Sequence, residues 1–316
     1  MSQPDWLRKA ASRAAEEVPA VTPLEEVVPG RVVHVDGDYL AYFASGGDEM
    51  RVDVSRRVAV ERMAAVRELA GAERVHLHLS ARASTKGERY HIAVTQPYQG
   101  QRSSSRRPKN WGAVREFLET ADPQILRVKR IEWFDREADD GFAAAALTAV
   151  NPVETVAIHT ADKDMRMLPG LHLAWKDYAR TEVPKGSYEV IGPYDGKVYG
   201  TKWFWMQMLT GDNADHIPGI RNVGEQKALK ALAGTTCNAE AYEVVEDEYR
   251  KFKGDDWADY FVEQAGLLWL RKSAHPHDYL RVLPAGYSTE IYDATVRLTK
   301  RVKEGREAID RINAQA

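Results

Sequence analysis

The chain has 316 residues, of which 44% are hydrophobic and 29% charged, and its formal net charge is −3. This size and composition fit about two globular domains with a real core, and the net charge argues against a protein that coats nucleic acid. The single cysteine, Cys237, excludes an internal disulfide and a cysteine zinc cluster. We see neither a membrane span nor a signal peptide, and we therefore expect a cytoplasmic protein with no membrane contact.

The predicted elements alternate between strands and helices over much of the chain. Residues 1–29 form an N-terminal extension or tether in this interpretation. Short apolar runs then predict strands at 31–36, 74–80, 125–133, 155–160 and 171–175, and helical spacing falls between them at 54–71, 111–120 and 138–150. Residues 187–200 indicate a hairpin, and almost everything after residue 201 reads as helix. This order predicts an α/β fold with a central parallel sheet that helices cover on both faces.

Charge is distributed unevenly along the chain. Between residues 82 and 109 one acid, Glu88, stands among seven cations, which are Arg82, Lys86, Arg89, Arg102, Arg106, Arg107 and Lys109. This segment has no clean period, so we interpret it as a polar loop or a mobile helical segment. A solvated basic loop is the simpler alternative to a nucleic-acid contact.

Acidic residues follow the predicted strands repeatedly. The carboxyl ends of parallel strands meet at one edge of a sheet, where ligands bind. Any one group could merely cap a helix, and Asp38 reads best as a turn residue. Together, however, so many acids at one edge would repel one another unless cations bind there, and oxygen ligands favour Mg²⁺ or Mn²⁺. Two such ions about 3.5–4 Å apart are a recurring device for phosphodiester cleavage. The candidate ligands are Asp36, Glu137, Asp139, Asp140, Asp162, Asp164, Asp212 and Asp215.

Five motifs in sequence order resemble the 5′-nuclease family, which includes phage 5′→3′ exonucleases, flap endonucleases and the 5′-nuclease domain of bacterial DNA polymerase I. The motifs are VHVDGDYLAY, QPYQGQR, READDGFAA, TADKDM and LTGDNADHIPGIRNVGEQKAL, and the match covers about residues 31–232. The resemblance implies a PIN-like α/β nuclease domain at residues 30–200, with a helical arch at about 81–110. It also implies a helical DNA-binding region at 201–316 that contains a helix–three-turn–helix.

The resemblance further implies roles for individual residues. One metal site would be built by Asp36, Glu137, Asp139 and Asp140. A second would be held by Asp162, Asp164, Asp212 and Asp215. The turn from Gly219 to Gly224 would grip duplex backbone with Lys227, usually around a bound K⁺. Arg102 would act in catalysis, and the DNA-binding set would be Lys86, Arg89, Tyr98, Gln99, Arg102, Arg106, Arg107, Gly219, Gly224 and Lys227, with Tyr98 stacking on an unpaired base.

Three positions depart from the family pattern. Ser80 stands near the place of an aspartate at the end of the second strand, and Gln99 replaces the arch lysine that helps to position the scissile phosphate. Lys86, Arg106 or Arg107 could compensate for that lysine. Asn222 replaces a glycine of the turn, although asparagine tolerates positive φ.

The expected function is therefore a metal-dependent 5′→3′ exonuclease or flap endonuclease that acts on DNA with a free 5′ end, flap or nick, and on RNA–DNA hybrids as a further substrate. The absence of a polymerase portion favours a free-standing, phage-type enzyme of replication or recombination in the host cytoplasm, with an unknown replication partner. The alternatives are a catalytically impaired DNA-binding protein of the same fold, a HAD-type phosphatase and a PIN-type ribonuclease.

Overall fold

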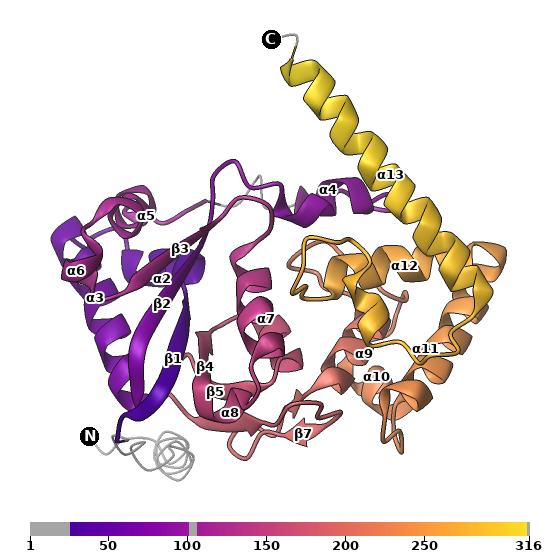
Figure 1. Cartoon of the computed structure of the whole chain (residues 1–316), viewed down its shortest axis with the longest axis horizontal. Coiled ribbons are helices and arrows are strands. Elements are labelled where there is room, and N and C mark those ends of the chain that lie inside the picture. Colours follow the sequence, from indigo (N-terminus) through magenta and orange to yellow (C-terminus); the bar gives the residue numbers. More distant parts are fainter. Residues whose placement is uncertain (1–25, 101–105, 315–316) are drawn as a thin grey trace, which may run out of the picture.

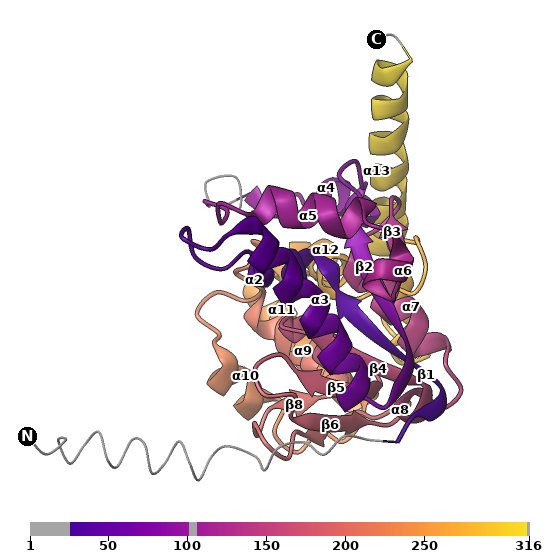
Figure 2. The same cartoon turned by 90° about the vertical axis from the view of Figure 1, so that its left-hand side faces the viewer.

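A computed structural model describes residues 26–100 and 106–314 (Figure 1). The predicted N-terminal extension therefore lies almost entirely outside the described residues, and so does Arg102. Within these ranges the chain forms a sheet with helices on both faces and a larger helical region beside it, as expected for the α/β class (Figures 1 and 2).

The central sheet has six strands in the order β3-β2-β1-β4-β5-β6. The five strands that pair in parallel were predicted, whereas β6 runs antiparallel to β5 and was not. Three of the four residues of β6 are polar or charged, so it carries no apolar run. The bounds are β1 Val28–Asp36, β2 Ala72–Ser80, β3 Lys129–Trp133, β4 Val156–Thr160, β5 Gly170–Ala174 and β6 Arg180–Val183.

Alternation along the strands divides the protein into two cores. Val33 and Val35 of β1 are fully buried against the helices of one face. His34 points the other way, toward Phe142 of α7. The helices of the first face are α2 Gly37–Ser45, α3 Val52–Leu69, α5 Trp111–Thr120 and α6 Pro123–Leu126, and α7 Ala138–Thr148 and α8 Pro152–Thr155 follow β3 in the chain.

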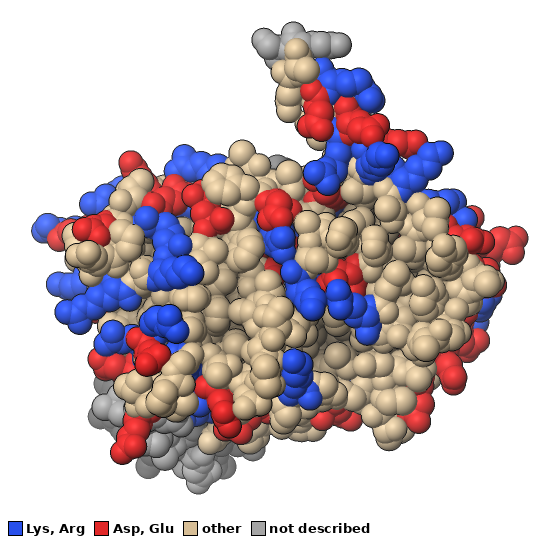
Figure 3. Space-filling view, in the orientation of Figure 1, with Lys and Arg blue, Asp and Glu red and all other residues tan. Residues whose placement is uncertain are grey.

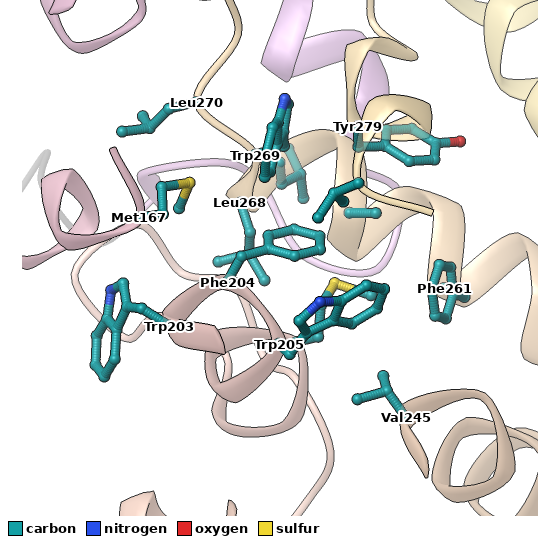
Figure 4. Close-up of a cluster of buried hydrophobic side chains, with 14 of the residues drawn as sticks. Met167, Trp203, Phe204, Trp205, Val245, Phe261, Leu268, Trp269, Leu270 and Tyr279 are labelled. Carbon is teal, nitrogen blue, oxygen red and sulfur yellow. The ribbon is translucent and has the colours of Figure 1, made fainter. Parts of the chain in front are cut away.

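The helical region packs around a second core rich in aromatic side chains. Phe204, Trp205 and Phe261 are fully buried there, together with Trp269 and Tyr279 (Figure 4). The hairpin predicted at 187–200 is present as β7 Val190–Ile191 and β8 Val198–Tyr199. The helices are α9 Thr201–Thr210, α10 Glu225–Ala231, α11 Asn238–Lys253, α12 Trp257–Leu268 and α13 Thr289–Asn313, and the 3₁₀ turns here are η4 Gly254–Asp256 and η5 Asp278–Arg281.

Two features concern the surface. Figure 3 shows cations and acids interspersed on one face, with a short diagonal run of Lys and Arg near its middle. None of the helices within the described ranges combines the length and the apolarity that a membrane span requires.

Candidate metal centre

The predicted acids gather where the parallel strands end, and several of them also cap helices. Asp36 ends β1 and is the N-cap of α2, where Oδ1 accepts a hydrogen bond from the backbone N–H of Tyr39 at 2.9 Å. Asp162 follows β4 and likewise accepts from the N–H of Asp164 at 2.8 Å. The capping and ligand interpretations are therefore compatible, because each cap occupies one lone pair of a carboxylate that has about four.

Three of the acids already form a group with metal-ligand spacing. One carboxylate oxygen from each lies within 4.8 Å of the others in the trio Asp164, Asp212 and Asp215. Gln207 donates to Asp164 at 2.6 Å, and the Lys163 ammonium lies 2.9 Å from Asp212. These neighbours orient the oxygens, and a set of three carboxylates fits a hard divalent cation such as Mg²⁺ or Mn²⁺.

A second group lies close enough to interact electrically with the first. Burial, followed by the charge of Asp38, raises the pKa of Asp36 to about 7. Burial raises the pKa of Asp162 to about 6, with Asp215 and Asp212 adding to the shift. Burial, then Asp162 and Asp36, likewise raises the pKa of Asp139 well above its usual range. Repulsion of this kind is what a bound cation relieves, so both groups fit metal ions.

Glu137 stands at the edge of the site toward the arch segment. The Tyr98 hydroxyl lies 2.7 Å from its Oε2 and 2.9 Å from Asp215 Oδ2. The Lys86 ammonium lies 3.2 Å from Glu137 Oε1, and the Gln99 amide nitrogen also reaches that oxygen at 3.2 Å. A single polar network thus joins Glu137 to the trio.

The structure contradicts two predicted DNA contacts and gives Asp140 a different environment. Arg89 is 2% exposed and Tyr98 is 4% exposed, so neither side chain can reach DNA directly or stack on a base. Both oxygens of Asp140 instead accept from the Arg89 guanidinium, at 2.8 and 2.9 Å. This buried pair lowers the pKa of Asp140 despite its burial, and a carboxylate held in that way is poorly placed to take a metal.

The end of β2 shows what replaces the missing aspartate. Ser80 Oγ accepts from the backbone N–H of Ala138 at 3.0 Å, at the start of α7. Its own N–H donates to Asp38, which is ion-paired with Arg115. Asp38 was expected to be only a turn residue, yet its charge raises the pKa of Asp36 and Asp139. The sequence analysis assigned no role to Arg115, Gln207 or Lys163. A polar side chain on its own does not indicate which distant residue it will contact in the fold.

The arch segment is only partly helical where it is described. It contains the 3₁₀ turn η1 Lys86–Glu88 and the short helix α4 Arg89–Ile92. Arg106 is exposed and pairs with Asp48 at 2.9 Å, while the exposed Arg107 lies over the ring of Trp111. Both are on the surface, where a phosphate could reach them.

The glycine turn between α9 and α10 is tightly built. Gly219 has φ +56, and a Cβ there would lie 2.2 Å from the nitrogen of Gly211. Asn222 has φ +64, which bears out the expectation that asparagine takes a glycine-like conformation here. Lys227 is exposed and donates to the Asn222 carbonyl at 2.8 Å. Because helix α9, rather than a strand, leads into Asp212, the HAD-type alternative loses its required context.

Comparison with known proteins finds relatives by sequence over part of the chain. No family model matches the chain. DNA polymerase I of Thermus aquaticus is 30% identical over 128 residues, which is 40% of this chain and 14% of the polymerase. DNA polymerase I of Thermus thermophilus is 29% identical over 230 residues, or 67% of this chain and 25% of the polymerase. The chain thus spans a quarter or less of these relatives.

Solved structures show the same fold. The T5 D15 protein co-crystallised with metal ions covers 87% of this chain with a TM-score of 0.50 and 14% identity, and the alignment takes in 98% of that protein. The bacteriophage T5 D15 flap endonuclease in complex with DNA and metal ions gives 0.51 at 12% identity, covering 86% of this chain and 99% of that one. The chain is thus similar to the 5′-nuclease family, in part of its sequence to these polymerases and in its fold to the T5 protein. Its own α/β sheet delivers several acids of the candidate centre.

Proposed function

We propose that this chain is a member of the 5′-nuclease family, a metal-dependent 5′→3′ exonuclease or flap endonuclease that hydrolyses DNA. The observation that carries the proposal is the trio Asp164, Asp212 and Asp215, whose ligand oxygens lie within 4.8 Å of one another. Beside the trio lie Asp36, Asp139 and Asp162, whose pKa values are raised. The polymerases that share its sequence, and the T5 flap endonuclease that was crystallised with DNA and metal ions, support DNA as the substrate.

The proposed reaction is hydrolysis of a phosphodiester at a 5′ end or flap. A water oxygen attacks phosphorus, the bond from phosphorus to O3′ breaks, and O3′ takes up a proton, which yields a 5′-phosphate and a 3′-hydroxyl. Two Mg²⁺ or Mn²⁺ ions, when bound, would ease deprotonation of that water and neutralise charge in the transition state. The trio would hold one ion, and Asp36, Glu137, Asp139 and Asp162 would hold the other.

The remaining parts of the proposal concern the substrate's path. The turn around Gly219 would contact duplex backbone without reading sequence, with K⁺ as its candidate ion. Arg106 and Arg107 would attract phosphates of a strand that passes the arch segment. Flaps, nicks and RNA–DNA hybrids are proposed substrates, and a role in phage replication or recombination, in the host cytoplasm, is the proposed context.

A binding protein without turnover is the second candidate, and two observations favour it. Ser80 Oγ is used to cap α7, and Gln99 offers a neutral amide beside Glu137 where the family has a lysine. Retention of seven acids in one connected site argues for the enzyme, because a protein that only binds DNA gains nothing from them.

The double variant Asp162→Asn/Asp164→Asn separates the two candidates. We expect it to lose cleavage of 5′-labelled DNA in Mg²⁺ by at least about a thousandfold while it still binds the duplex, because both ion sites lose a charged ligand. The exposed acid Asp48, changed to Asn, is the control and should cut normally. Retained turnover in the double variant would refute the metal roles assigned here.

A further inference from the structure

Lys86 is held at the edge of the metal centre by an unusual stretch of backbone. Three consecutive residues, Lys86, Gly87 and Glu88, have positive φ values of 53°, 63° and 64°. L-residues avoid this region, so two of the three positions are strained, and surrounding contacts must enforce the conformation. The turn lies between the end of β2 and α4, and Figure 1 shows this connection passing beside the sheet toward α13.

Those contacts come from a buried arginine far away in the sequence. Arg271 follows α12 and is 1% exposed, and its Nη2 donates to the carbonyl of Gly87 at 2.7 Å. A Cβ on Gly87 would lie 2.3 Å from that nitrogen, so only glycine leaves room for the contact. Arg89 adds a second bond, from Nη1 to the Lys86 carbonyl at 3.2 Å.

Asp140 ties the two arginines together. It accepts both hydrogen bonds from Arg89 and also the backbone N–H of Arg271 at 3.0 Å. Arg271 gains little else, because its Nε and Nη1 are buried without a hydrogen-bond partner among the described residues. A buried cation with unused donors destabilises the fold. The presence of Arg271 at this position therefore indicates a role other than stabilising the protein.

The result of this arrangement is the position of one ammonium group. Lys86 Nζ lies 2.6 Å from Gln99 Oε1 and 3.2 Å from Glu137 Oε1, and its side chain remains 26% exposed. It is therefore a cation at the mouth of an acidic site, able to leave Glu137 when an ion takes that carboxylate. Two other cations of the segment, Arg106 and Lys109, are directed toward Asp48 instead.

We propose that Lys86 supplies the positive charge that meets the substrate phosphate beside the metal centre, and that Arg271 is the positioning residue that fixes it there. The assignment rests on the proposed function for the nature of the substrate. Position 99 carries glutamine where the family has a lysine. Lys86 would take the place of that lysine, because the turn brings it to the Gln99 side chain. Before metal binds, Lys86 serves as a counterion to Glu137.

The test uses binding measurements on the full chain, so that it does not depend on turnover. Fluorescence anisotropy with a 5′-flap duplex in Ca²⁺, with intact probe checked on a gel, gives the DNA affinity, and calorimetry gives the Mn²⁺ affinity. We expect Lys86→Met to weaken DNA binding by about tenfold, the value of a charge-assisted hydrogen bond. It should also tighten Mn²⁺ binding, because the competing cation at Glu137 is gone; a purely structural role would not do so. Lys86→Arg should restore DNA affinity in part, and the control Lys109→Met should change neither value.

The positioning role is tested by combining variants. Arg271→Met alone should weaken DNA binding as Lys86→Met does, and the double variant should lose no more than either single one. Gly87→Ala, which crowds the Arg271 contact and also strains the turn because φ is +63, is the second route if Arg271→Met does not fold by circular dichroism. Additive losses would overturn the role of Arg271, and wild-type DNA and Mn²⁺ affinities in Lys86→Met would overturn that of Lys86. A wild-type chain that binds the flap duplex and never cuts it would refute the proposed hydrolysis alone.

Discussion

At the scale of single residues, the metal centre is a set of carboxylates oriented by neutral and cationic partners. Thr160 donates to Asp36 at 3.0 Å, Gln207 donates to Asp164 at 2.6 Å, and Lys163 lies 2.9 Å from Asp212. Each partner orients one carboxylate oxygen, but the negative charges of neighbouring carboxylates still repel one another. Without a cation this repulsion stores free energy, which ion binding would release.

Buried histidines make a separate, testable contribution to stability. His159 is fully buried, stacked on Trp175 with ring centroids 4.4 Å apart. One ring nitrogen lies 3.1 Å from the Leu173 carbonyl and the other accepts from Arg62 at 3.1 Å, so no site is left for a second proton. Burial, with Arg62 as the second cause, lowers the pKa of His159 to about 3.

In the folded state His159 therefore stays neutral at pH values where the unfolded chain protonates it, below 6.5. The free energy of unfolding consequently decreases as the pH falls from 6.5 toward 3. Moving from pH 7.5 to 5 should cost about 2 kcal/mol at this position. We expect His159→Gln to be destabilised relative to wild type at pH 7.5, and the difference in unfolding free energy between the two proteins to shrink by that amount at pH 5. Urea unfolding at both pH values measures it, and a constant difference would contradict the assignment.

The sequence could place the acids but not their roles. The acids that follow predicted parallel strands were expected to meet at one edge, because the carboxyl ends of such strands lie together. Asp212 and Asp215 follow helix α9, so strand topology alone did not place them. That Asp140 leaves the group was not predictable, since it depends on Arg89 and on Arg271, which lies 131 residues further along the chain. Arg89 and Tyr98 looked like surface residues for the same reason: only the packed helical region buries them.

At the scale of elements, the turn between α9 and α10 depends on a close approach of two backbones. Gly219 N–H also donates to Gln264 of α12, and its carbonyl accepts from Tyr260 at 2.5 Å. The turn is thus fixed to α12 as well as to Asp212, whose backbone pairs with Ile217. Any shift here would be transmitted to the trio.

Gly219→Ala should therefore destabilise the protein by about 1–3 kcal/mol, because the new Cβ meets backbone 2.2 Å away at a positive φ. The proposed duplex contact should weaken with it. Gly286→Ala, outside the turn, is the control, since nothing lies within 4 Å of its Cβ and its φ is not positive. Thermal unfolding and duplex binding of the two variants decide the matter, and equal effects of both would show that the close approach is unimportant.

The elements that were predicted correctly are those with the clearest hydrophobic pattern in the sequence. The buried strands β1, β2 and β4 and helices such as α5 carry continuous or periodic apolar patterns, and they were found. The edge strand β6 was missed because it buries only two of its four residues. The arch segment shows only two short helical turns, η1 and α4, within the described residues, in keeping with its lack of periodicity.

At the scale of the whole molecule, the α/β sheet and the helical region meet at the metal centre. Asp36, Asp139 and Asp162 come from the sheet side, while Asp212 and Asp215 come from the loop after α9. Arg89 and Arg271 link the arch segment to the end of α12. A substrate that occupied the centre would thus contact both parts.

Cleavage of a 5′-labelled flap duplex beside a blunt duplex, with Mg²⁺ in one set and EDTA in the other, tests the central claim most directly. The account predicts short 5′ fragments or mononucleotides only with Mg²⁺, and their lengths will separate flap cutting from exonuclease action. Intact DNA in Mg²⁺, with the duplex still bound, would contradict it and would identify a DNA-binding protein that has lost its chemistry.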